Sequence, residues 1–180
     1  ATQSFVHQFQ DMANGVAASV QVLAQDYALR AAIAQGDQAT LASALNNHGR
    51  RVGAAQMLLV GVDGRIEADT TGQWPAGSAF PHPGLLDRAL QDPGAALVTW
   101  EQRAYWMVVV PVFAPDLVGY IGAAMPVDDR VVLRLQQQST LPKSIELVAA
   151  DASGEVAVLA RGSDPGPLAV PLAGGGRLPT

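Results

Sequence analysis

The chain has 180 residues, of which 49% are hydrophobic and 15% charged, a balance that indicates a folded domain and not a disordered segment. Its net charge of -5 argues against a nucleic-acid partner, because the only adjacent basic residues are Arg50 and Arg51 and no basic stripe could neutralise a row of phosphates. The absence of cysteine excludes disulfides, thiolate metal sites and a cysteine nucleophile.

The beginning of the chain carries the pattern of a long amphipathic helix that runs to about Ala34. Its apolar residues recur at three- and four-residue steps: Phe5, Phe9, Met12, Val16, Val20, Leu23 and Tyr27. We expect this helix to stop near Gly36, and a second helix, capped by Asp37, to run through Leu45 to about Val52. The first helix is longer than a small domain needs, so it is either an ordinary core helix or a stalk that forms a homodimer.

A β-hairpin is predicted next. An apolar run at 56–62 leads to Asp63-Gly64, a dipeptide typical of type I′ turns, and a more polar strand follows at 65–69. Glu67 and Asp69 alternate on that strand and are expected to face solvent near a sheet edge.

The segment 70–84 is too rich in glycine and proline to form a regular element, yet it holds three large rings, Trp74, Phe80 and His82. A loop that carries so many rings is expected to pack onto the fold. A short helix at 85–90 follows it.

The most informative stretch predicts two central strands, 103–113 and 117–127, which follow a strand at 96–100. Both faces of the first central strand are apolar, because Tyr105, Met107, Val109 and Phe113 alternate with Trp106, Val108, Val110 and Val112. The sheet should therefore be covered on both faces, by helix on one side and by either packing or a ligand pocket on the other. Pro111, Pro115 and Asp116 argue against a membrane span in this stretch.

Beyond Asp129 the pattern predicts a helix, and then a second hairpin from strands at 145–150 and 156–159. The two hairpins are either an ordinary pair or the sign of a second module. Glycine and proline dominate from Gly162 onward, which indicates either a linker or a truncated continuation of the fold.

No catalytic or metal-binding constellation is visible. His7, His48 and His82 lie far apart in the sequence, and the chain has no HExxH motif and no Gly-x-Ser-x-Gly elbow. We therefore expect no metal, no cofactor and no enzymatic activity, with a small hydrolase built from scattered residues as a rival interpretation.

The candidate ligand-binding residues are large side chains with polar tips on the ring-bearing loop and the central strands: Trp74, His82, Trp100, Arg103, Tyr105 and Tyr120. Gly119 and Gly122 are expected to leave room for a ligand against the sheet. Arg103 is the first choice for an anion, because its planar guanidinium can hold a carboxylate with two hydrogen bonds. Each has a structural alternative, with Trp100 and Tyr105 as core packing and Arg103 as a solvated side chain.

Residues 5–160 resemble the extracytoplasmic double-Cache type sensor domains of bacterial signalling proteins, and are most similar to those fused to GGDEF and EAL domains. The resemblance rests on the long entry helix and on four motifs: LLVGVDGRIEADT (58–70), FPHPGLL (80–86), VVPVFAP (109–115) and GYIGAAMPVDD (119–129).

This resemblance implies an α+β, PAS/Cache-like fold with a central antiparallel sheet of five to six strands flanked by the long N-terminal helix. It divides the chain into N-terminal helices at 1–52, a sensor module at 53–140, an additional hairpin at 141–162 that could belong to a vestigial second module, and a Gly/Pro-rich tail or linker at 163–180.

The implied function is that of a ligand-sensing domain on the periplasmic side of the inner membrane, tethered in its parent protein. It would bind a small molecule, with carboxylates and amino acids as candidates, and pass a conformational shift through its helices to a cytoplasmic output of the GGDEF/EAL type. The parent protein would be a diguanylate cyclase or phosphodiesterase, or alternatively a histidine kinase. The alternative is a protein-protein interaction module without a small-molecule ligand.

Overall fold

The computed structural model describes residues 2–100, 103–128, 146–150 and 156–161. Their helices are α1 Thr2–Ala24, α2 Tyr27–Gln35, α3 Gln38–Val52 and α4 Pro83–Gln91. Their strands are β1 Gln56–Val60, β2 Ile66–Asp69, β3 Ala95–Trp100, β4 Arg103–Phe113, β5 Leu117–Val127, β6 Glu146–Ala150 and β7 Val156–Arg161.

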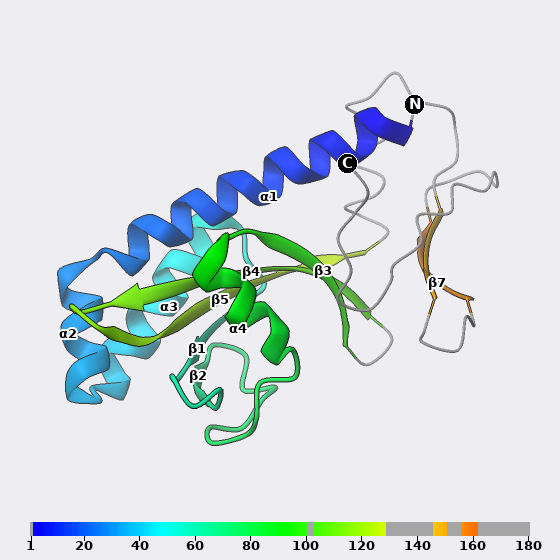
Figure 1. Cartoon of the computed structure of the whole chain (residues 1–180). Coiled ribbons are helices and arrows are strands. Elements are labelled where there is room, and N and C mark those ends of the chain that lie inside the picture. The colour runs from blue at the N-terminus through cyan, green and yellow to red at the C-terminus, as the bar shows by residue number, and fades with distance from the viewer. Residues whose placement is uncertain (1, 101–102, 129–145, 151–155, 162–180) are drawn as a thin grey trace. The chain divides into compact units, whose positions relative to one another are not determined.

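Five strands form one antiparallel sheet in the order β2-β1-β5-β4-β3, and β6 pairs with β7 separately (Figure 1). This is the predicted α+β architecture with an N-terminal helix, and the predicted order of hairpin, loop, short helix and three strands is confirmed. β2 lies at a sheet edge, as the sequence indicated.

The chain forms two compact units. The larger contains residues 13–95 and 107–125, and the smaller contains residues 1–12, 96–106 and 126–180. In the smaller unit, β6 and β7 make the second predicted hairpin, with Ala150 opposite Val156. The helix predicted after Asp129 and the linker predicted from Gly162 lie outside the described residues, and the four-part division of the chain stays a prediction.

The first helix is not continuous, so the prediction of one helix to about Ala34 is wrong. It breaks after Ala24, and the carboxylate of Asp26 accepts a hydrogen bond from the Leu29 amide at 2.8 Å, which caps α2. The apolar period runs on through the break, so hydrophobic spacing alone concealed it. The stop at Gly36, with φ of 67°, and the Asp37 cap of α3 are both as predicted.

The predicted apolar stripe is confirmed only in part. Val16 and Val20 of α1 are buried as expected, whereas Met12 is 38% exposed, and Tyr27, which begins α2, is 81% exposed. The other buried positions of α1 in the larger unit are alanines: Ala13, Ala17 and Ala24. A stripe of small side chains lets a helix approach its neighbours closely, and alanine carries too weak a hydrophobic signal to define the stripe from sequence.

The two faces of the sheet have different covers. Met57 is opposite Ala123 and Leu58 is opposite Gly122 in the pairing of β1 with β5. A Cβ on Gly49 of α3 would lie 2.8 Å from the Met57 side chain, so α3 packs on the face that Met57 shares with Leu59, Ile121 and Ala123. We call this the helix face.

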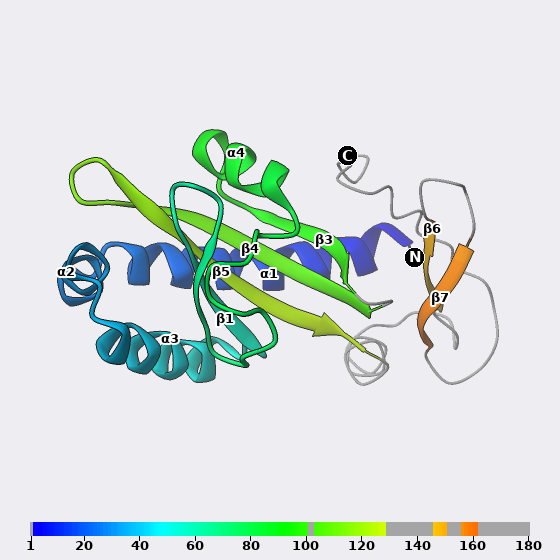
Figure 2. The same ribbon diagram turned by 90° about the horizontal axis from the view of Figure 1, so that it is seen from below.

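The opposite face carries Leu58, Val60, Tyr120 and Gly122. Figures 1 and 2 show α1 on one side of the larger unit's strands and the segment after β2 on the other. We call this second side the loop face.

Burial along β4 follows the same alternation. Every second residue from Ala104 to Val112 is buried, which gives one fully covered face. The other set is buried only at its centre: Arg103 and Phe113 are exposed, Tyr105 and Pro111 are half-buried, and Met107 and Val109 are buried. The prediction of two apolar faces is therefore correct for the middle of the strand, while its ends are open on one side.

The turn of the first hairpin differs by one residue from the predicted one. The Gly64 amide donates to the Gly61 carbonyl at 3.0 Å, so Val62 and Asp63 are the central residues of the turn. Gly64 follows them with φ of 77°, a conformation that glycine adopts without strain.

Candidate ligand-binding site

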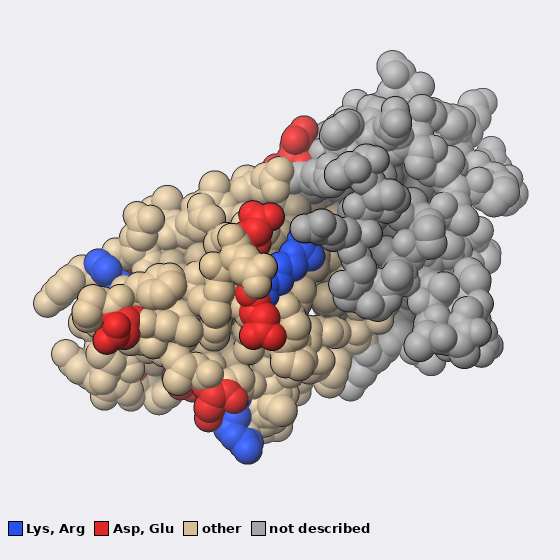
Figure 3. All heavy atoms as spheres, viewed as in Figure 1, with Lys and Arg blue, Asp and Glu red and all other residues tan. Residues whose placement is uncertain are grey.

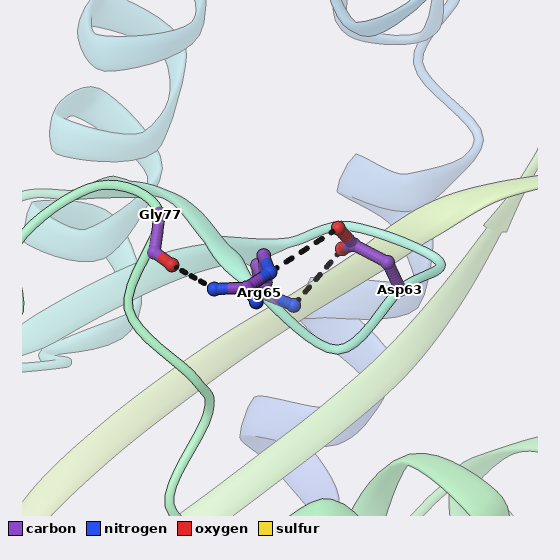
Figure 4. Close-up of polar contacts among 3 residues, drawn as sticks. All are labelled: Asp63, Arg65 and Gly77. Carbon is purple, nitrogen blue, oxygen red and sulfur yellow. Dashed lines mark hydrogen bonds and ion pairs between the residues drawn. The ribbon is translucent and has the colours of Figure 1, made fainter.

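The loop after β2 is docked onto the sheet edge, as its rings predicted. The Gly77 amide donates to the Ile66 carbonyl at 2.7 Å, and the Ile66 amide donates to the Ser78 carbonyl at 2.8 Å. Figure 4 shows that Arg65 also donates to the Gly77 carbonyl, at 2.7 Å, while it forms an exposed ion pair with Asp63. This backbone pairing holds the second half of the loop in place.

Three rings of the loop region lie in series. Trp74 and Phe80 meet edge to face with centroids 6.2 Å apart, and Phe80 meets His82 in the same way at 6.1 Å. Trp74 and Phe80 are buried and His82 is half-buried. Two of the predicted site residues, Trp74 and His82, are thus joined through Phe80, which lies outside the predicted set of ligand-binding residues.

On the loop face of the sheet, Tyr120 is 5% exposed. Burial raises the pKa of its hydroxyl above the ordinary value, and the carboxylate of Asp87 on α4 adds to this rise. The hydroxyl is therefore a neutral group that can donate or accept a hydrogen bond at physiological pH.

The two glycines of β5, Gly119 and Gly122, lie on opposite faces of the sheet. A Cβ on Gly122 would lie 3.4 Å from Leu58 Cβ and 3.8 Å from Met107 Sδ, so this glycine sits on an apolar floor. A Cβ on Gly119 would lie 2.9 Å from the Val60 carbonyl oxygen and 3.7 Å from Leu59 Cδ1, which belongs to the helix face. The room for a ligand expected at Gly119 is therefore absent from the loop face.

The remaining predicted residues belong to the smaller unit. Trp100 and Tyr105 are half-buried and Arg103 is exposed. Arg103 and Tyr105 alternate along β4 with the buried residues Ala104 and Trp106. The gathering of all six predicted residues into one pocket stays a prediction.

The acid-base behaviour of His82 limits what the loop can offer a ligand. Burial lowers its pKa below the usual value of 6.5, and its Nε2 atom is buried without a hydrogen-bond partner in the described structure. At neutral pH the ring is therefore uncharged, and it can supply a hydrogen bond but no positive charge to an anion.

The lowered pKa of His82 predicts a loss of stability in acid. Because the unfolded chain binds the proton more readily, the contribution of this residue to stability is full above pH 6.5 and is lost as the pH falls through the lower folded-state pKa. We expect His82→Gln to flatten the decline, as measured by urea unfolding between pH 7.5 and pH 5. An unchanged decline would contradict the shift.

His48 serves as a comparison for that experiment. Its pKa is also lowered, mainly by burial and further by Arg51, against the opposing effect of a hydrogen bond with the Ser19 backbone. His48→Gln should therefore remove a separate part of the pH dependence, and the two effects should add because the residues lie in different parts of the fold.

A groove lies at another place in the larger unit, where α2 meets the turn between β4 and β5. Its volume is about 410 Å³, and it is lined by Tyr27, Arg30, Ala31, Ala34, Ala114 and Pro115. Arg30 crosses to the turn, where its Nη1 donates to the Phe113 carbonyl at 3.3 Å. Sequence reasoning missed this groove, because Tyr27 continued the apolar period of a helix and was assigned to its buried face.

Charge is sparse and mixed on the visible surface. On the face shown in Figure 3, basic side chains stand singly, and acidic side chains lie beside some of them. Among the described residues there is no group of three or more His, Cys, Asp or Glu side chains that could hold a metal ion. Within the same described part, no helix has both the length and the apolar character for crossing a membrane.

An antiparallel sheet with helices on one face and a docked, ring-bearing loop on the other is the PAS-like fold that the sequence predicted. The chain belongs to the dCache_3 family, described as the double sensory domain of two-component sensor kinases, whose model matches residues 1–155. It is therefore a sensory module of a signalling protein and not a catalytic one. No protein of curated function matches the chain.

Solved structures with the same fold are sensor domains. The E. coli DcuS sensor domain is 15% identical, with a TM-score of 0.57, over 71% of this chain and 94% of that one. The sensor domain of the V. cholerae histidine kinase DctB is 13% identical, with a TM-score of 0.53, over 79% and 62%. At these identities the likeness concerns the fold alone.

A chemoreceptor shares this fold as well. The ligand-binding domain of Campylobacter jejuni Tlp3, in complex with 4-methylisoleucine, is 12% identical to the chain, with a TM-score of 0.55, over 89% of this chain. The chain spans 65% of the length of that domain and 62% of the DctB domain.

Proposed function

We propose that the chain is the extracytoplasmic ligand-sensing domain of a membrane-bound bacterial signalling protein, located on the periplasmic side of the inner membrane. The observation that carries this proposal is the family match over residues 1–155. The arrangement of a helix face and a loop face agrees with it, because a sensor needs one face to bind a ligand and helices to transmit the change.

The proposed ligand is a small amino acid or carboxylate held on the loop face. The apolar floor at Leu58 and Met107 suits an aliphatic side chain, and the neutral hydroxyl of Tyr120 can hydrogen-bond a polar group. Arg103 would bind a carboxylate through its guanidinium, which Trp74, His82, Trp100 and Tyr105 would surround. The Tlp3 domain, which shares the fold, is solved with 4-methylisoleucine and with other aliphatic amino acids.

The helices are the elements that would transmit the signal to the proposed output. Ligand binding would favour one arrangement of the domain, and α1 would carry the shift to a cytoplasmic GGDEF/EAL output, the class suggested by the sequence motifs. The family description names sensor kinases, so a kinase is the rival to a GGDEF/EAL output. The output domain of the parent protein decides between the two. A homodimer through α1 is proposed as well, because Met12 and Val22 are exposed apolar side chains on that helix.

A thermal-shift experiment tests the ligand proposal. The purified domain is heated with L-isoleucine, L-valine, L-glutamate, acetate and succinate, each at millimolar concentration. A ligand that binds only the folded state raises the melting temperature, and at about 100 times its Kd it adds about 2.7 kcal/mol of stability. We expect at least one compound to stabilise the wild type, and Arg103→Ala to abolish the shift.

Arg30→Ala is the matched control for this experiment. It removes an arginine from the groove at the turn between β4 and β5, so it should leave the shift intact. Equal shifts in the wild type and in Arg103→Ala would remove Arg103 from the site. The absence of any shift across a panel of amino acids and carboxylates would reject the ligand class.

One observation favours the alternative, a module that binds a protein partner. The groove at α2 is lined by a large exposed aromatic side chain, since Tyr27 is 81% exposed, together with Ala31, Ala34, Ala114 and Pro115. Tyr27→Ser would weaken the binding of such a partner and leave small-molecule binding unchanged. The two functions are therefore separated by which of Tyr27→Ser and Arg103→Ala has an effect in the assay of the parent protein's output.

A further inference from the structure

Asp69, at the end of the edge strand β2, accepts hydrogen bonds from three residues. Its Oδ1 accepts from the Thr71 amide at 2.9 Å and from the side chains of Gln56 and Thr71 at 3.0 Å. Its Oδ2 accepts from the Trp74 amide at 2.8 Å. The sequence pattern had placed this carboxylate in solvent, but it is half-buried and holds the first half of the ring-bearing loop.

The position of Asp69 on the sheet is equally specific. It is directly opposite Leu58 on β1, and Leu58 is in turn opposite Gly122 on β5. Residues opposite each other in antiparallel strands project to the same side, so Asp69 lies on the loop face in one row with the apolar floor. Gln56 is only 4% exposed, and its amide nitrogen also donates to the Thr71 hydroxyl at 3.0 Å.

The chemistry requires a carboxylate at this position. Both oxygens of Asp69 act as acceptors at the same time, toward Thr71 and Gln56 on one side and toward Trp74 on the other. An amide has only one acceptor oxygen, and its NH₂ group would face a donor. Asparagine would therefore leave either the Trp74 amide or the Gln56 side chain without its acceptor.

We propose that Asp69 is a positioning residue that holds the ring-bearing loop closed over the loop face, so that Trp74 forms one wall of the ligand site. It acts through the backbone of the loop and does not itself bind the ligand. This inference rests on the proposed function for its consequence in ligand binding, while its structural part stands on the hydrogen bonds alone. The loop then has two anchors. Asp69 holds its first half through the Trp74 amide, and Arg65 holds its second half through the Gly77 carbonyl.

Hydrogen exchange of the 180-residue chain tests the proposal without a ligand. In Asp69→Asn we expect one of the Thr71 and Trp74 amides to lose its acceptor and to exchange about tenfold faster or more. The other should exchange faster by a smaller factor, because its hydrogen bond is no longer charge-assisted. The amides of β5 should keep their protection. The affinity for whichever panel compound stabilises the wild type most should fall by a similar factor.

Two variants control for charge and for stability. Asp116→Asn removes the same charge at the exposed turn between β4 and β5, and it should change neither exchange in the loop nor affinity. Leu41→Ala destabilises α3, where Leu41 is 1% exposed, and it should speed exchange broadly with no preference for the loop.

Unchanged exchange at Trp74 in Asp69→Asn would overturn the proposal. So would a uniform acceleration equal to that of Leu41→Ala, because it would reveal a role in general stability only. A selective loss of protection with unchanged affinity would also overturn it. If no compound binds the wild type, the proposed function fails, whereas selective exchange at Trp74 would still establish the anchor.

Discussion

Replacement of Ile121 by alanine is expected to lower the free energy of unfolding by about 2–5 kcal/mol, which is a large part of the stability of a small domain. Ile121 is 0% exposed and lies in the centre of β5, opposite Leu59 on the helix face. The substitution removes three carbons from a site that strands and helices enclose, so the cavity cannot collapse fully. Urea unfolding followed by circular dichroism measures the change.

Val62→Ala is the control for this measurement. Val62 is a β-branched residue of similar size, but it lies in the hairpin turn and is 61% exposed, so its loss should change stability by no more than about 0.5 kcal/mol. Similar losses in the two variants would mean that the helix face is not the core of the fold.

Gly119→Ala is expected to have the second large effect, with a loss of about 1–3 kcal/mol or more. The added methyl group would stand 2.9 Å from the Val60 carbonyl oxygen, which is backbone and part of the strand pairing, so it cannot move aside as a flexible side chain would. β1 and β5 would have to separate at this point. The loss should appear both in urea unfolding and in the exchange of amides along β1.

Gly122→Ala, three residues along the same strand, provides a close comparison. Its methyl group would meet Leu58 Cβ at 3.4 Å, an ordinary van der Waals contact, so stability should change by less than about 1 kcal/mol. The methyl group would also take up space on the apolar floor of the proposed ligand site. A reversed order of the two variants would contradict the assignment of their faces.

The sequence predicted the fold correctly where a local pattern of residues favours a single type of secondary structure. Asp37 followed by an apolar period predicted the cap of α3, and the alternation from 103 to 113 predicted a strand with two apolar faces. The break at Asp26 was missed because a carboxylate cap is also a normal residue on the exposed face of a helix. The hairpin turn was predicted one residue too late, at Asp63-Gly64, because glycine occurs at different positions in several turn types.

The candidate site could be predicted only in part, because it depends on pairing between distant strands. The ring side chains of Trp74 and His82 indicated their place in the site, but the contact of each with Phe80 depends on how the loop folds back. The role of Asp69 requires the register that sets it opposite Leu58, and a strand pattern does not contain that register. The groove at Tyr27 depends on the break in the helix, so an error in one element concealed it.

The central claim is that a small molecule binds on the loop face, beneath the ring-bearing loop. An NMR titration of the isotope-labelled domain with the most stabilising compound of the panel tests this claim most directly. We predict that the shifted signals include the Trp74 indole and the amides of Tyr120 and Gly122, with saturation at a single affinity. Shifts confined to Tyr27, Ala114 and their neighbours, or no shifts with any compound, would contradict the account.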